Sequence, residues 1–158
     1  MWWRLSRSEF NRQKGEGNKK ALKTLIENGA VPGILAFLDR EAIGWCAIAP
    51  RECYLTLERS RVLKRVDDEP VWSVVCLFIA KTYRRRGVST KLLQAAVKHA
   101  AQHGGSIVEG YPVEPKKSHT PDPFAYTGLA SAFRTIGFVE VMRRGETRPM
   151  MRLRVELY

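Results

Sequence analysis

The sequence lacks any uninterrupted apolar stretch close to the roughly 18 residues that a membrane-spanning helix requires. It also lacks a secretory signal, because the amino-terminal segment Met1–Leu5 is followed at once by polar and charged residues. Neither a low-complexity tract nor an internal repeat interrupts the 158 residues, so we expect one domain that covers residues 1–158. These absences predict a cytoplasmic protein that folds as a single unit and does not span a membrane.

Cysteine is scarce, and the spacing of Cys46, Cys53 and Cys76 matches neither a zinc pair nor a redox Cys-x-x-Cys motif. We therefore expect these thiols to be buried or half-buried. His99 and His103 lie one turn apart in a predicted helix, but a third metal ligand is missing nearby in the sequence. The sequence accordingly predicts no metal site, and a solvated helix face is the simpler interpretation of the two histidines.

Acidic residues are few compared with basic ones. The 27 lysines and arginines outnumber the 16 aspartates and glutamates, which gives a formal net charge of +11. This balance favours an anionic partner and leaves open nucleic acid, an acidic protein, an anionic membrane or a phosphate-bearing cofactor. The basic residues form several clusters, Arg59–Arg65, Arg84–Arg86 and Arg143–Arg154, and the second of these lies in a recognisable motif.

Strand-like and helix-like segments alternate along the chain, which predicts an α/β fold. Helices are expected near residues 8–28, with Gly15 and Gly17 weakening the middle, and at residues 87–103 and 125–136. Strands are expected at residues 33–38, 42–48, 71–79, 106–113, 138–143 and 149–157. The charged residues 51–66 predict a partly helical surface excursion, and residues 114–123, rich in proline and lysine, predict a loop.

The middle of the chain predicts a strand–helix–strand unit. The run Val71–Ile79 is apolar without alternation, as in a strand buried on both faces. Gly87–His103 carries its apolar residues on one side and is followed by the strand Ser106–Val113. Two strands joined by such a helix are expected to pair in parallel within one sheet.

Between that first strand and the helix lies the segment Arg84-Arg85-Arg86-Gly87-Val88-Ser89. The amino terminus of a helix presents unpaired N–H groups and a partial positive charge, and glycine lets a ligand approach the backbone closely. The segment therefore predicts a phosphate site, although a basic turn that caps a helix would look the same. It lacks both the Gly-Lys-Ser/Thr of a nucleoside triphosphate loop and the spaced glycines of a dinucleotide fingerprint, which argues against ATP and NAD.

This segment resembles the acetyl-CoA motif of the GNAT superfamily, in which Arg or Gln is followed by two residues, Gly, one residue, and Gly or Ala. The matching positions are Arg84, Gly87 and Ser89, and serine departs from the pattern at the last place. The element order from about residue 31 onward and the triplet Ile136-Gly137-Phe138 resemble the same family. The resemblance implies a GNAT-like acyl-CoA N-acyltransferase fold of the α/β class, with a mixed central sheet, helices on both faces and splayed central parallel strands.

The resemblance also implies acetyl-CoA as the cosubstrate and indicates which residues bind it. In this family the acyl-pantetheine lies in the gap between the splayed strands and bonds to strand backbone. By position, Leu77, Phe78 and Ile79 are predicted to contact the pantetheine and thioester, and they can pack in the core at the same time. The pyrophosphate is predicted to be bound at the motif, by Arg84, Arg85, Arg86, Gly87, Val88, Ser89 and Thr90.

Three residues are candidates for the proton transfers of amine acetylation. Many relatives carry a glutamate near the end of the central strand, where this sequence has Cys76. Glu109 matches a glutamate that other relatives use as the base, and an ordinary exposed strand carboxylate is the alternative interpretation. Phe133 replaces the tyrosine that many relatives place four residues before Gly-Phe. Tyr126 and Tyr111 are therefore candidate proton donors, or else packing residues.

The sequence thus predicts an acetyl-CoA-dependent N-acetyltransferase in which a primary amine attacks the thioester directly. The acceptor is predicted to be a small-molecule or protein amine that meets residues 51–66 and 114–123, where Lys116, Lys117 and His119 lie. Two alternatives stay open, a GNAT-type modifier of aminoacyl-tRNA and a catalytically silent module that binds CoA or nucleic acid. Nucleic acid is not favoured, because no interleaving of aromatic and basic residues marks an RNA surface.

The first 30 residues are short for the opening strand and two helices of the family. That edge is expected to be either truncated or completed by a partner chain, which leaves a homodimer open.

Overall fold

The computed structural model describes residues 1–116 and 125–155. Its helices are α1 (Arg7–Arg12), α2 (Glu16–Glu27), α3 (Leu55–Arg59), α4 (Val88–Gln102) and α5 (Ala130–Thr135), with short 3-10 turns at Arg51–Cys53 and Lys81–Tyr83. Its strands are β1 (Gly33–Leu38), β2 (Glu41–Pro50), β3 (Trp72–Ile79), β4 (Ile107–Gly110), β5 (Val139–Gly145) and β6 (Arg148–Arg154).

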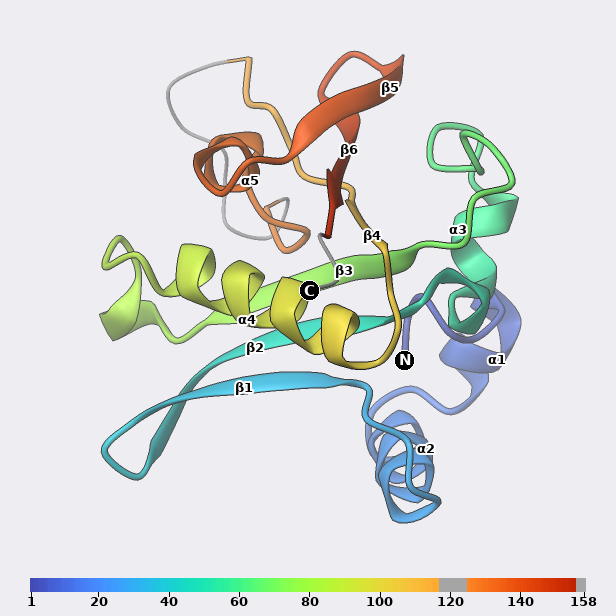
Figure 1. The fold of residues 1–158 in the computed structure, drawn as a ribbon. Coiled ribbons are helices and arrows are strands. Elements are labelled where there is room, and N and C mark those ends of the chain that lie inside the picture. The colour runs from blue at the N-terminus through green and yellow to red at the C-terminus, as the bar shows by residue number, and fades with distance from the viewer. Residues whose placement is uncertain (117–124, 156–158) are drawn as a thin grey trace.

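The six strands form one mixed sheet in the order β1-β2-β3-β4-β6-β5. β3 and β4 are parallel, and every other neighbouring pair is antiparallel. Figure 1 shows α4 and α5 beside the sheet, with α1, α2 and α3 gathered near the start of the chain and well away from the tip of the β1–β2 hairpin. The predicted α/β class, mixed sheet and parallel central pair are confirmed.

The first helical region divides where the sequence predicts a break. Gly15 caps the amino terminus of α2 with φ of 81°, a left-handed conformation that glycine adopts without steric penalty. Ser6 and Glu9 form a reciprocal capping box at the start of α1. The helix α2 ends at Glu27 with Asn28 as its C-cap, just before Gly29, as the sequence indicates.

The helix predicted at residues 125–136 is wrong at its start, because α5 begins at Ala130. Gly128 has φ of 90°, so the chain turns there instead of continuing in helical geometry. An added Cβ at Gly128 would lie 2.8 Å from Leu77 Cδ1, which shows how closely this turn packs on β3. Tyr126 therefore lies in a turn ahead of the helix and not on it.

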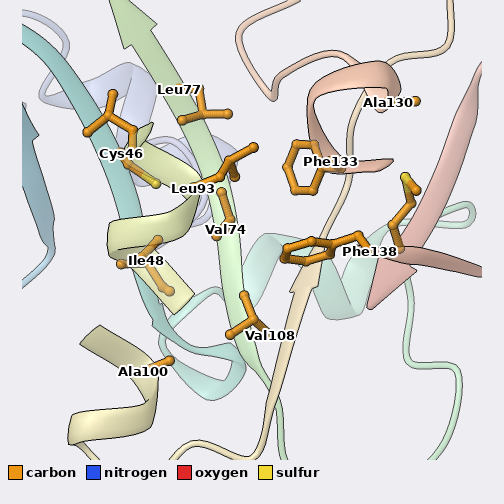
Figure 2. Packing of buried hydrophobic residues seen from close by; sticks show 13 residues of the cluster. Cys46, Ile48, Val74, Leu77, Leu93, Ala100, Val108, Ala130, Phe133 and Phe138 are labelled. Atoms are coloured by element: carbon orange, nitrogen blue, oxygen red, sulfur yellow. The ribbon is translucent and has the colours of Figure 1, made fainter. Parts of the chain in front are cut away.

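Two apolar clusters fill the two faces of the sheet. On one face α4 and α5 pack on the strands, and Figure 2 shows Leu93 of α4 beside Val74 and Leu77 of β3, with Phe133 of α5 to the right of them. The other face is covered by the amino-terminal segment and by the connection after β2, which contribute Trp3, Tyr54, Leu57 and Leu63 to the second cluster. Helices thus cover both faces, as predicted.

The segment 51–66 is partly helical, as predicted, and many of its side chains are exposed, but it is not confined to the surface. Arg51, Tyr54 and Leu57 are all at most 2% exposed, because this segment closes the second cluster over the sheet. Cys53 is exposed, against the expectation of a buried thiol, while Cys46 is buried and Cys76 is half-buried.

The rings of His99 and His103 lie 5.6 and 5.9 Å from Trp72, so the two histidines pack beside an aromatic residue instead of lying on a fully solvated face. Among the described residues, no helix has the length and apolar character needed to cross a membrane. The same part of the chain holds no cluster of three or more His, Cys, Asp or Glu that could bind a metal ion.

Candidate active site

The amino terminus of α4 has the features that the sequence predicts for a phosphate site. Gly87 is the N-cap, with φ of 75°, and a Cβ added there would meet no atom within 4 Å. The backbone N–H groups of the first turn lack partners within the helix, and that turn contains no acidic side chain. An anion can therefore approach the backbone of Val88, Ser89 and Thr90 at the positive end of a 15-residue helix.

The three arginines before this helix have different surroundings. Arg84 is half-buried and donates from Nε to the backbone oxygen of Ile79 at 3.0 Å. Arg85 is exposed and has φ of 59°, a left-handed conformation that is uncommon outside glycine. Arg86 is exposed and lies over the ring of Tyr83, with 5.7 Å to the ring centroid. Arg85 and Arg86 thus supply positive charge at the surface beside Gly87.

The central parallel strands separate soon after they pair. Their ladder joins Trp72–Val74 to Val108–Gly110, and β3 then continues to Ile79 paired with β2 but not with β4. A register shift leaves Val75 as a bulge opposite β2, and such bulges bend the strand that carries them. β4, predicted to reach Val113, ends at Gly110. The predicted splay therefore begins directly after Val74.

The turn that contains Tyr126 occupies part of the gap between these strands. The backbone N–H of Leu77 donates to the carbonyl of Tyr126 at 2.7 Å, and the N–H of Val113 donates to Gly128 at 2.8 Å. Leu77 is predicted to contact the pantetheine, but its backbone N–H thus has a partner within the protein. Ile79 presents its backbone to the same edge two residues later, because strand residues alternate in direction. Phe78, between them, has a side chain that is 55% exposed.

Glu109 lies in a buried ionic network. Its side chain is 1% exposed, one oxygen accepts from Arg51 at 2.9 Å and from Tyr111 at 2.7 Å, and the other accepts from Arg152 at 2.6 Å. Arg152 also donates to Asp67 at 2.6 Å. With both oxygens bonded and little access to solvent, Glu109 has the surroundings of a residue that holds strands together.

The two arginines of this network keep their charge. Burial alone would lower the pKa of Arg51, but Tyr111, Glu58 and Glu109 raise it above its ordinary value. Burial likewise opposes the charge on Arg152, and Asp67 with Glu109 raises its pKa. The network therefore contains two permanent cations around the Glu109 carboxylate, and β4 is tied by it to β6 and to the connection after β2.

Tyr111 and Tyr126, the two predicted proton donors, differ in access. Tyr111 is fully buried, and burial together with Glu109 raises the pKa of its phenol well above the ordinary value. Tyr126 is 38% exposed, and its ring stacks on Trp3 with 6.4 Å between centroids. Burial raises the pKa of Tyr126, and the nearby charge of Arg148 opposes that rise. Of the three predicted catalytic residues, Tyr126 is the one that reaches the surface.

Two further positions depart from the family pattern. Cys76 is half-buried, and burial raises the pKa of its thiol while the positive amino terminus opposes the rise. Phe133 is fully buried and packs edge to face on Phe138, with centroids 5.0 Å apart. It also fills the space that a side chain at Gly110 would need. Phe133 is therefore a core residue.

Sequence reasoning missed Arg51 and Arg152. Arg152 lies between Met151 and Leu153, and such alternation ordinarily places the polar residue in solvent. Arg51 begins a charged stretch, and such a stretch ordinarily lies at the surface. Both arginines are instead buried, because they pair with the buried Glu109. No local sequence pattern indicates that pairing.

Comparison with known proteins identifies solved structures that share this fold. Three crystal structures superpose on most of the chain, with 13 to 15% identity and TM-scores of 0.55 to 0.56. They are the PaiA N-acetyltransferase of Thermoplasma acidophilum in complex with coenzyme A, an acetyltransferase of the GNAT family from Streptococcus pneumoniae, and the ribosomal-protein-alanine N-acetyltransferase of Brucella melitensis.

The superpositions cover 96, 89 and 89% of this chain and 80, 77 and 78% of those proteins, in the same order. At such low identity they establish a shared fold. No curated protein sequence matches the chain.

The sequence itself gives a broader assignment. Residues 1–114 match the family model described as the acetyltransferase (GNAT) family. This range includes the splayed strands β3 and β4, the motif around Gly87 and all of α4. The chain therefore belongs to the GNAT acetyltransferase family.

Proposed function

We propose that this protein is an acetyl-CoA-dependent N-acetyltransferase that acts on a primary amine. One observation carries the proposal. A left-handed glycine with open space around it caps a 15-residue helix, directly after a strand that leaves its neighbour. Family membership supports the same conclusion, as does the bound coenzyme A of the Thermoplasma structure.

The residues present suit this cosubstrate. The first turn of α4 would hold the pyrophosphate through backbone N–H groups, with Arg85 and Arg86 supplying charge beside it. The edge of β3 beyond Val74 would align the pantetheine, with Ile79 and Phe78 nearest the motif. When bound, the thioester supplies an activated acetyl group for the amine to attack.

The acceptor is expected on the face of the sheet opposite α4, because α4 fills the other face of β1, β2 and β3. Cys76 belongs to this face, since it pairs with Ala47, which packs against the second cluster. Tyr126 is exposed beside it. An amine on that face would meet the strand edge from the side away from the helix.

An alkyl ammonium has a pKa near 10.4, so the acceptor must lose a proton before it attacks at neutral pH. Glu109 as base and Tyr111 or Tyr126 as proton donor remain predictions. For Glu109 to act, Arg51 or Arg152 would have to release one of its oxygens. Tyr126 needs no such rearrangement to reach an acceptor, and it is the donor that the geometry favours.

Ligand-induced stabilisation tests the cofactor assignment. CoA or acetyl-CoA at about 100 times its dissociation constant should stabilise the protein by about 2.7 kcal/mol, which is several degrees in melting temperature for a domain of this size. ATP and NAD at the same concentration should do much less. A melting temperature that does not change when CoA is added would remove the basis of the proposal.

A CoA-binding module without turnover is the second candidate. It is favoured by the full pairing of Glu109 and by Cys76 and Phe133 at two customary catalytic positions. Release of free thiol from acetyl-CoA should be measured across amino acids, polyamines, peptides and charged tRNA. Stabilisation by CoA with no thiol release from any acceptor would favour the silent module.

A further inference from the structure

An exposed apolar row crosses β1, β2 and β3 on the face opposite α4, on a part of that face outside the second cluster. Leu35 of β1 pairs with Trp45 of β2, and Trp45 pairs with Phe78 of β3, so the three side chains lie side by side on one face. Leu35 is 53% exposed and Phe78 is 55% exposed. Ile34 and Ala36, which alternate with Leu35 on β1, pack against the α4 side instead. The row therefore lies opposite α4.

The next row along the same strands consists of small residues. Gly33 pairs with Ala47, and Ala47 pairs with Cys76. The indole of Trp45 leans over this row, because a Cβ added at Gly33 would lie 2.7 Å from two of its ring atoms. Small side chains beside a row of large ones give the face a shallow apolar step that leads from Leu35 to Cys76.

This surface has the wrong chemistry for a polycation. β1 and β3 contain no carboxylate, and β2 contains one, Glu41, at the hairpin turn. Glu41 accepts from the hydroxyl of Tyr83 at 2.7 Å. A polyamine lying on the row would meet aromatic and aliphatic side chains where its distant ammonium groups need anions or water.

One amine next to an apolar group fits the same surface well. Apolar contacts with Leu35, Trp45 and Phe78 can hold the apolar part of such a molecule, which leaves its amine free to reach the strand edge. Cys76 joins the row to the strand edge at Leu77, where the thioester is proposed to lie. Through this continuity, one molecule can contact both the row and the reacting group.

We propose that the acceptor is an apolar primary amine, preferably an aromatic one, whose apolar part lies on Leu35, Trp45 and Phe78. The inference rests on the proposed acetyltransferase function and adds the class of acceptor to it. Leu35, at the far end of the row from the thioester, is then a specificity residue that does not touch the reacting atoms.

The test compares 4-phenylbutylamine, n-propylamine and spermidine as acceptors, with thiol release from acetyl-CoA as the measurement. The ring is separated from the amine by four carbons because β1 and β3, two strand spacings apart, lie about 10 Å from one another. The kcat/KM for 4-phenylbutylamine should exceed that for each of the other two by about tenfold or more, since binding in an apolar site follows buried apolar area. Leu35→Gln should lower the value for 4-phenylbutylamine by about five- to tenfold, mainly through KM, and change the value for n-propylamine less than about twofold.

Val139→Gln is the matched control. Val139 is 63% exposed on β5, at the opposite edge of the sheet, so its replacement makes the same kind of change away from the row. This variant should keep the preference for 4-phenylbutylamine. Phe78→Ala should lower the kcat/KM for 4-phenylbutylamine as Leu35→Gln does, and CoA affinity measured separately shows whether its backbone role is intact.

Three kinetic results would overturn the inference. They are a preference for spermidine, an equal loss of both monoamines in Leu35→Gln, and no turnover of any of the three amines by protein that still binds CoA. A dimer in sedimentation that Leu35→Gln converts to monomer would also overturn it, because the row would then be an interface between two copies. The proposed function survives any of these results if another amine is acetylated, whereas failure to bind CoA would overturn both.

Discussion

At Gly87 a single added side chain tests where the cofactor phosphates bind. Gly87→Asp would place a carboxylate and a Cβ where the backbone is now open to an anion. Like-charge repulsion should weaken CoA by about tenfold or more, which corresponds to about 1.4 kcal/mol. Isothermal titration calorimetry of the folded variant gives the affinity.

Gly104 provides the control for this substitution. It lies just beyond the carboxyl-terminal end of α4, has φ of 80°, and also has no atom within 4 Å of an added Cβ. Gly104→Asp therefore introduces the same backbone strain without approaching the phosphate site, and its CoA affinity should be unchanged. Equal affinity of the Gly87 variant and the control would mean that the phosphate binds elsewhere.

Glu109 is the residue whose loss should be felt most in stability. Glu109→Gln leaves Arg51 and Arg152 without the carboxylate that now accepts from both, and removing one member of a buried ionic network typically costs about 3–5 kcal/mol. Urea denaturation should therefore show a large fall in the free energy of unfolding. Glu140→Gln, in an ion pair with Arg143 at the surface, should change it by less than about 1 kcal/mol.

The same variant distinguishes the two roles of Glu109. A base contributes about 10² to 10⁴ in rate, and the defect should shrink as pH rises because more of the acceptor is then unprotonated. A residue that only positions β4 should lower activity in step with the folded fraction, at any pH. A Glu109→Gln protein as stable as wild type would contradict the network described here.

At the scale of elements, α5 and β4 meet through one close contact. An added Cβ at Gly110 would overlap the ring of Phe133, so Gly110→Ala should lower the free energy of unfolding by about 1–3 kcal/mol. Phe133→Ala alone should lower it by about 3–5 kcal/mol, because it opens a cavity. In the double variant the new methyl group enters that cavity. The loss in free energy of unfolding, measured by urea denaturation, should therefore be smaller than the sum of the two single losses. Strict additivity would mean that the two residues do not share this space.

Elements with a regular pattern were predictable from the sequence, and elements set by distant contacts were not. The apolar spacing of α4 and the glycine before it indicate both the helix and its phosphate-binding end. The start of α5 was predicted wrongly because the residues after Ala125 fit a helical period, whereas the packing of Gly128 on Leu77 forces a turn. That packing brings together residues 51 positions apart, which no local pattern encodes.

The candidate site divides in the same way. The phosphate-binding part of the site consists of a short motif whose residues act through their own backbone, so the sequence alone could indicate it. The surroundings of Glu109 depend on Arg51 and Arg152, which lie 58 and 43 positions away along the chain. Its buried pairing could be found from the fold and not from the strand in which it lies.

Over the whole molecule, many surface carboxylates are paired with arginines. The pKa of Asp67 is lowered mainly by its hydrogen bond with Arg152, and the pKa of Glu114 is lowered by Arg134 and Arg143. A carboxyl group whose pKa is lower in the folded state stabilises the fold fully above its unfolded pKa, and that stabilisation is lost as pH falls through the folded value. The protein should therefore lose stability below about pH 4.5.

Urea denaturation between pH 7 and pH 3 measures this dependence. The double variant Asp67→Asn/Glu114→Gln should be less stable at neutral pH, and its loss on acidification should be smaller than that of the wild-type protein. Lys23 and Glu27 form an exposed pair one helical turn apart, so Glu27→Gln serves as the control and should follow the wild-type curve. Identical curves for all three proteins would contradict a contribution from Asp67 and Glu114.

The position of β6 in the sheet has a consequence for how the chain is made. β6 lies between β4 and β5 although it follows both in the sequence, so β4 has an open edge until residues 148–154 have left the ribosome. Until then Glu109 also lacks Arg152. An unpaired strand edge is where chains join one another. A nascent chain stalled before residue 148 is therefore the form of this protein most exposed to aggregation and most dependent on chaperones.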